Sequence, residues 1–114
     1  GYEIWIITAR FDSETYRIQF NTSYENAIKA NRDLFEVATN IGIPYDRIKF
    51  MNMQDKYNFF LDKDFIWHLD DDRDENKLIL KYTNTKGISS WGNSSWKYKC
   101  QRLIKNYLLK NENV

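Results

Sequence analysis

Three consecutive acids, Asp70-Asp71-Asp72, are the strongest candidates for chemistry in this 114-residue chain. They directly follow the largely apolar residues 65–69. Carboxylates crowded at the end of a buried strand repel one another and lose hydration, and a divalent cation relieves both costs. Hard cations such as Mg²⁺ take oxygen ligands. Acids also favour a helix N-terminus, so the triplet by itself leaves a metal site and a helix cap as open alternatives.

Thr8, Arg10 and Lys56 are candidates for holding a phosphate. Thr8 follows the apolar residues 4–7, and a hydroxyl with backbone N–H groups at a strand end can hold a phosphate oxygen. Arg10 can add a forked contact. Lys56 can neutralise a phosphate or hold an acidic nucleophile. Each has an ordinary alternative, because a strand-terminal threonine often forms a turn and a surface lysine is often only solvated.

Strands and helices alternate along the chain, which indicates a parallel sheet covered by helices. Ligands of such sheets bind beyond the carboxyl ends of the strands. The polar residues above lie at those ends. We expect strands at 4–7, 47–51, 65–69 and 88–91, a loop at 10–21, helices at 23–41 and 54–62, a helix around 78–82, and a last helix after 94.

Caps and breaks delimit the expected helices. Ser23 can cap the first helix, and Gly42 offers a left-handed stop. Gly87 is expected to break the helix that follows the acidic triplet, and Ser94 to cap the last one. The last helix carries an apolar stripe made of Trp96, Cys100, Leu103, Ile104, Tyr107 and Leu108.

Composition narrows the class of protein. The length fits one domain covering 1–114, and a net charge of +1 gives no global field toward nucleic acid or a membrane. Cys100 is the only cysteine, so an internal disulfide and a cysteine-based zinc site are excluded, and we expect it to be a small buried hydrophobe. No run approaches the ~20 apolar residues of a membrane span, so a cytoplasmic protein is expected. His68 is expected to support the site rather than bind metal.

The order of these motifs resembles the haloacid-dehalogenase-like (HAD) phosphohydrolase superfamily. The second motif of that family, a hydrophobic strand ending in Ser or Thr, is matched by residues 5–8. Its third motif, a lysine ahead of the next strand, is matched by Lys56. Its fourth, a hydrophobic strand ending in paired acids, is matched by residues 66–71. The resemblance covers about residues 2–91 and implies a three-layer Rossmann-like parallel sheet with helices on both faces.

The resemblance also implies a chemistry. An aspartate attacks phosphorus and forms an aspartyl-phosphate, with Mg²⁺ bridging carboxylates and phosphate. By this resemblance Thr8 binds the phosphoryl group, Lys56 steadies it and the nucleophile, and Asp70 and Asp71 complete the metal site. Arg10 follows the threonine where nucleotidases and polynucleotide 3′-phosphatases of the family often have arginine, so it is expected to touch a nucleotide or nucleic-acid end.

The first motif of the family, a strand ending in Asp-x-Asp, is absent from residues 1–114. In the family fold this strand lies at the sheet centre, between the strands expected at 3–8 and 65–70. We therefore expect an upstream segment or a partner chain to fill the slot, unless those two strands pair directly. The alternative function is a catalytically inactive HAD-like protein that binds nucleic acid or a protein partner, with Trp91, Trp96 and the basic last helix as the contact.

Overall fold

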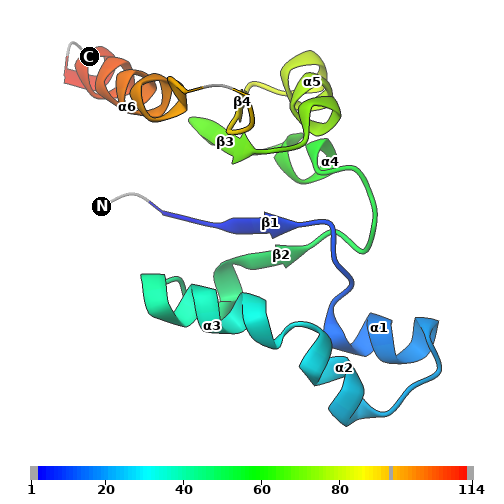
Figure 1. Ribbon diagram of the computed structural model, residues 1–114. Helices are drawn as coiled ribbons and strands as arrows, with labels where there is room; N and C mark the ends of the chain where they lie inside the picture. The colour runs from blue at the N-terminus through cyan, green and yellow to red at the C-terminus, as the bar shows by residue number, and fades with distance from the viewer. Residues whose placement is uncertain (1–2, 93, 113–114) are drawn as a thin grey trace. The chain divides into compact units, whose positions relative to one another are not determined.

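The computed structural model describes residues 3–92 and 94–112, which form a mixed α/β protein with six α-helices and two small parallel sheets (Figure 1). The chain divides into two compact units, Gly1–Lys56 and Tyr57–Val114. Each unit holds one two-stranded sheet. The expectation of a single domain over 1–114 and of a three-layer sheet stays a prediction.

The first unit pairs its two strands in parallel, with Ile6 opposite Ile48 and Thr8 opposite Phe50. Its core forms where the helix at 32–41 covers this sheet. Buried Ala38, Ile43 and Ile48 pack there with Ile6, Leu34, Phe35 and Phe50. The elements are β1 (Ile6–Thr8), α1 (Ser13–Gln19), α2 (Tyr24–Ala30), α3 (Arg32–Ile41), the 3-10 helix η1 (Tyr45–Arg47) and β2 (Ile48–Phe50).

Two helix predictions in this unit were wrong. The segment expected to be a loop contains α1, because the Asp12 side chain accepts from the backbone N–H of Thr15 and caps a helix there. The single helix expected at 23–41 is two helices that meet at Asn31. This side chain is buried and its Nδ2 donates to the carbonyl of Phe11, a tertiary contact that turns the chain at this point.

The capping predictions for the same region were confirmed. Ser23 Oγ accepts from the backbone N–H of Asn26 and begins α2. Gly42 ends α3 in the left-handed conformation, at φ 80°. This conformation costs an L-residue about 1–2 kcal/mol and glycine nothing comparable.

The second unit also pairs its strands in parallel, with Trp67 opposite Lys86 and Asp70 opposite Ser89. Phe60 and Ile79 are its most completely buried apolar side chains, and the Phe60 ring lies edge-on to Phe65. The elements are α4 (Tyr57–Phe60), β3 (Trp67–Asp70), α5 (Arg73–Tyr82), β4 (Lys86–Ser89) and α6 (Trp96–Glu112).

The role predicted for Gly87 was wrong. Helix α5 ends four residues earlier, where the extended backbone of Thr83 donates its N–H to the carbonyl of Ile79 and leaves the helix. Gly87 instead lies inside β4. The last helix begins at Trp96, close to the expected cap at Ser94.

Helix α6 is packed along only part of its expected apolar stripe. Cys100 is buried, as predicted, whereas Tyr107 and Leu108 are 46% and 47% exposed. Among the residues placed by the structure, no helix combines the length and apolar character needed to cross a membrane.

Candidate functional site

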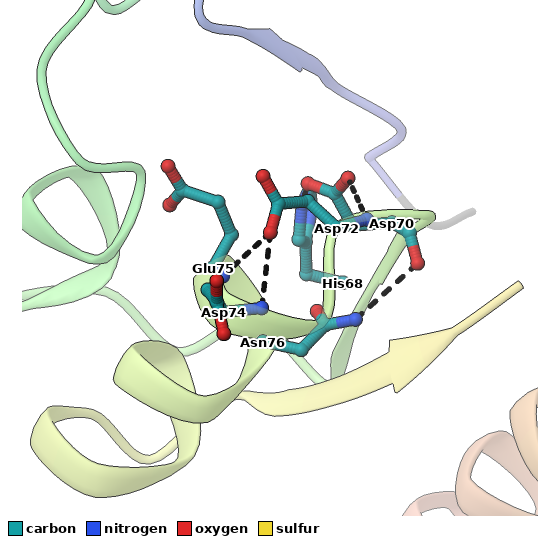
Figure 2. Close-up of polar contacts among 6 residues, drawn as sticks. All are labelled: His68, Asp70, Asp72, Asp74, Glu75 and Asn76. Atoms are coloured by element: carbon teal, nitrogen blue, oxygen red, sulfur yellow. Dashed lines mark hydrogen bonds and ion pairs between the residues drawn. The ribbon is translucent and has the colours of Figure 1, made fainter. Parts of the chain in front are cut away.

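Asp70 is a buried carboxylate at the carboxyl end of β3 (Figure 2). Its Oδ2 lies 2.9 Å from Nε2 of His68, and its Oδ1 accepts from the backbone N–H of Asp72 at 3.1 Å. Both oxygens are thereby engaged, and the carboxylate is held in one orientation. His68 contacts Asp70 directly, and the supporting role expected for it at a metal site stays a prediction.

Asn76 fixes the end of β3 to helix α5. Its side chain is 5% exposed, and its Nδ2 donates to the main-chain carbonyl of Asp70 at 3.3 Å (Figure 2). Gly87 makes this close approach possible. A Cβ placed on Gly87 would lie 2.9 Å from Asn76 Oδ1 and 3.0 Å from the Asn76 carbonyl oxygen. The missing side chain at Gly87 therefore helps to position Asp70.

The three acids of the triplet differ in burial and in role. Asp70 is buried, whereas Asp71 and Asp72 are exposed. Asp72 caps α5, because its Oδ1 accepts from the backbone N–H groups of Asp74 and Glu75 at 2.9 and 3.2 Å (Figure 2). The helix-cap interpretation of the triplet is thus confirmed for Asp72. Asp71 is exposed and directly follows Asp70. Within residues 3–92 and 94–112, no three or more His, Cys, Asp or Glu side chains are grouped so that they could hold a metal ion.

Thr8 and Arg10 lie at the carboxyl end of β1 in the first unit. Thr8 Oγ1 accepts from the backbone N–H of Arg10 at 3.3 Å, as a turn-forming threonine does. The Arg10 guanidinium forms a forked ion pair with Asp33 at 2.8 and 3.0 Å. This hydrogen-bonded pairing raises the pKa of Arg10 and lowers the pKa of Asp33 to about 2. A phosphate that takes the same two Nη groups of Arg10 would have to replace the Asp33 carboxylate.

Sequence reasoning missed a polar network beside these residues, built from Asp12 and Asn52. The backbone N–H of Asp12 donates to Asn52 Oδ1 at 3.0 Å, and Asn52 Nδ2 donates to Asp12 Oδ2 at 3.3 Å. The hydrogen bond from the Thr15 N–H is the main cause of the lowered pKa of Asp12. The sequence did contain a signal for the helix cap at Asp12. An Asp before a helix, with an acid such as Glu14 in the first turn, is a typical N-terminal pattern.

The loop after β2 adopts an unusual backbone at the same end of the sheet. Asn52 and Met53 both have positive φ, at 53° and 67°. Their backbone N–H groups donate to the carbonyls of Arg10 and Ala9, at 3.1 and 2.7 Å. These bonds hold the segments after β1 and β2 together and make one polar rim in the first unit.

The predicted site residues belong to different units. Thr8, Arg10 and the half-buried Lys56 are in the first unit, and Asp70 and Asp71 are in the second. Their assembly into one site stays a prediction. A groove of about 480 Å³ in the first unit is lined by residues of α2, α3 and η1 and includes none of the predicted site residues.

The chain matches no protein-family model, and neither a curated protein nor a solved structure resembles it at a significant level. Function is therefore inferred from the motifs and from the geometry within each unit.

Proposed function

We propose that this chain is most of a Mg²⁺-dependent phosphatase domain of the HAD-like type, which hydrolyses phosphomonoesters of nucleotides or nucleic-acid ends through an aspartyl-phosphate. One observation carries the proposal. Asp70 is a buried carboxylate held in one orientation at the carboxyl end of β3, and the exposed Asp71 follows it. This is the place where the resemblance puts a pair of metal-binding acids.

The nucleophile belongs to the strand that completes this sheet. We assign it to an Asp-x-Asp segment upstream of Gly1 or on a partner chain, because residues 1–114 contain no matching motif. The edge of a sheet is a template for another strand, so in this proposal the segment pairs beside β1 or β3.

The proposal places a hard cation at Asp70 and Asp71 and a phosphate at Thr8, Arg10 and Lys56. Asp70 is an oriented carboxylate and Asp71 an exposed one, and both offer the oxygen ligands that Mg²⁺ takes. Bound Mg²⁺ would neutralise charge on the phosphoryl oxygens. In this proposal Thr8 binds the phosphoryl group, Lys56 steadies it and the nucleophile, and Arg10 exchanges Asp33 for the substrate phosphate.

The test is phosphate release by the protein expressed from its whole natural gene, with Mg²⁺ and with nucleotides or 3′-phosphorylated oligonucleotides as substrates. Asp70→Asn should lower kcat by at least about a hundredfold, because metal-ion stabilisation supplies several kcal/mol. Asp74→Asn is the matched control, since Asp74 lies in the first turn of α5 and only its backbone N–H contacts Asp72. Equal loss in both variants, or full activity in Asp70→Asn, would refute the assignment.

A non-catalytic binding protein is the second candidate, and two observations favour it. Arg10 is already paired with Asp33. The basic side chains of α6 are also exposed, which suits contact with phosphates; they are Lys97, Lys99, Arg102, Lys105 and Lys110. Salt-dependent binding of single-stranded oligonucleotides without phosphate release in any Mg²⁺ assay would favour this function.

A further inference from the structure

Helix α5 and strand β4 form a groove of about 270 Å³ within the second unit. Arg73, Lys77 and Leu80 line it from the helix, Ser89 from the strand, and Trp91 and Gly92 from the segment after the strand. None of these residues has a role in the proposed phosphatase chemistry. Its volume lies just below the roughly 300 Å³ at which pockets for drug-sized ligands usually begin, so the groove takes at most a ligand of about one nucleotide.

Trp91 and Arg73 make a flat, charged platform at one end of the groove. The Arg73 guanidinium carbon lies 5.0 Å from the centre of the Trp91 ring. Gly92 has φ 67°, and a Cβ placed on it would lie 2.8 Å from Arg73 Nη2. The guanidinium therefore lies against both the indole and the Gly92 backbone. The Trp91 side chain is still 65% exposed, so aromatic surface remains for stacking.

Two cations share the groove side of α5. Arg73 and Lys77 are one turn apart, and residues at this spacing are neighbours on a helix surface. Both are exposed, and within the described part of the chain neither forms an ion pair with a carboxylate. Asp74 and Glu75 are about 100° and 200° around the helix from Arg73, so they are on other faces.

The floor of the groove contains a buried polar group without a partner. Asn76 lines the groove and is 5% exposed, and its Nδ2 is used by the Asp70 carbonyl. Its Oδ1 has no hydrogen-bond partner in the described structure and lies beside Gly87. Buried polar atoms are nearly always satisfied. This oxygen is closed to solvent, so a hydrogen-bond donor of a ligand could reach it only after Asn76 or β4 shifts.

We propose that this groove binds one nucleotide unit, with the base stacked on Trp91 and the phosphate held by Arg73 and Lys77. An anion alone would not use the exposed indole, and an uncharged aromatic compound would not use the two cations. A free nucleotide and a nucleotide of single-stranded nucleic acid share this chemistry. The proposal goes beyond the phosphatase function and depends on no catalytic residue.

The test uses two probes without Mg²⁺, so that its outcome is separate from catalysis. Binding of AMP is measured by calorimetry, and binding of a short fluorescein-labelled single-stranded oligonucleotide by anisotropy. Trp91→Ala should weaken binding by about tenfold or more, because base stacking on an aromatic side chain carries that much affinity. Trp91→Phe should keep most of the wild-type affinity, because phenylalanine retains an aromatic ring. Binding of AMP alone would identify a free-nucleotide site, and binding of both probes a nucleic-acid site.

Charge is tested separately. Arg73→Gln and Lys77→Gln should each weaken binding. Each should also reduce the slope of log K against log salt concentration by about one, the value of one phosphate contact. Lys81→Gln, on the same helix but outside the groove, should change neither. Gly92→Ala should also weaken binding, because the added Cβ displaces the Arg73 guanidinium.

Three results would overturn the proposal. The first is the absence of binding of either probe to the wild-type chain, and the second is unchanged affinity in both Trp91→Ala and Arg73→Gln. The third is a loss of affinity only with Lys99→Gln or Arg102→Gln, which would place the interface on α6. Far-UV circular dichroism checks that each variant is folded, and binding repeated on Asp70→Asn separates the groove from the proposed catalytic site.

Discussion

Replacing Gly87 by alanine should destabilise the second unit, although it adds only one methyl group. The added Cβ would lie 2.9 Å from Asn76 Oδ1, 3.0 Å from the Asn76 carbonyl oxygen and 3.1 Å from Asn76 Cα. Two of these three atoms belong to the backbone of α5, so they cannot rotate away. The methyl group can be accommodated only if α5 moves away from β4.

The magnitude follows from three terms. Forcing an extra methyl group into a packed site costs about 1–3 kcal/mol. Loss of the hydrogen bond from Asn76 to the Asp70 carbonyl adds about 1 kcal/mol. Alanine restricts the unfolded chain more than glycine does, which offsets about 0.4–1 kcal/mol. We therefore expect a net loss of about 2 kcal/mol, and a fall in Tm of about 10 °C for a unit of this size.

Thermal unfolding followed by tryptophan fluorescence and near-ultraviolet circular dichroism measures this loss. Gly42→Ala is the contrasting variant, since Gly42 has φ 80° and nothing within 4 Å of an added Cβ. Its cost of about 1–2 kcal/mol should come from backbone strain alone. Hydrogen exchange should then show faster opening of β4 in Gly87→Ala and of the end of α3 in Gly42→Ala.

A double variant decides between a backbone and a side-chain collision. Removing Oδ1 with Asn76→Ala relieves only one of the three close contacts, so Gly87→Ala should remain destabilising in that background. Complete rescue by Asn76→Ala would show that the side chain alone carries the effect. Wild-type stability of Gly87→Ala would refute the close approach of α5 to β4, and with it the account of how Asp70 is positioned.

Two further outcomes follow from the titrating groups. The pKa of Asp12 is lowered in the folded chain, mainly by the hydrogen bond from the Thr15 N–H, so its stabilising effect is present above the unfolded value near 3.8 and is lost as the pH falls through the folded value. Urea unfolding should therefore show that Asp12→Asn lowers the free energy of unfolding at neutral pH but not in acid. An equal effect at the two pH values would contradict the hydrogen-bond network around Asp12. Burial raises the pKa of Cys100, so a thiol-specific disulfide reagent should label the native chain more slowly than the urea-unfolded chain at pH 8. Equal labelling rates would show that the α6 face carrying Cys100 is open.

Local signals in the sequence predicted the parts of the fold that depend on local chemistry. The four apolar segments became four parallel strands, and Ser23 and Gly42 ended up as helix caps. These features depend on side chains within a few residues of one another. The break at Asn31 depends on a hydrogen bond to Phe11, 20 positions away, and Asn31 is neither a glycine nor a proline. No local pattern indicates it.

The candidate site was predictable to a similar degree. The end of β3 was correctly identified as a place where acidic residues gather, and Asp72 proved to be the helix cap. The partners of Asp70 could not be anticipated in full. Asn76, in the next helix, donates to the Asp70 carbonyl. Gly87, in the next strand, has no side chain and so leaves space for Asn76. The pairing of Arg10 with Asp33 could not be anticipated either, because it depends on the approach of α3.

The two strand pairs also set an order of folding. In the first unit Ile6 pairs with Ile48, 42 positions later, and in the second Trp67 pairs with Lys86, 19 positions later. Closing the longer loop costs about 0.7 kcal/mol more chain entropy. Local contacts also form faster than distant ones, so β3, α5 and β4 should assemble first. Pulse-labelled hydrogen exchange during refolding would show protection of β4 before β2. During synthesis the first unit leaves the ribosome before the second. The first unit would therefore be synthesised earlier but form its sheet later.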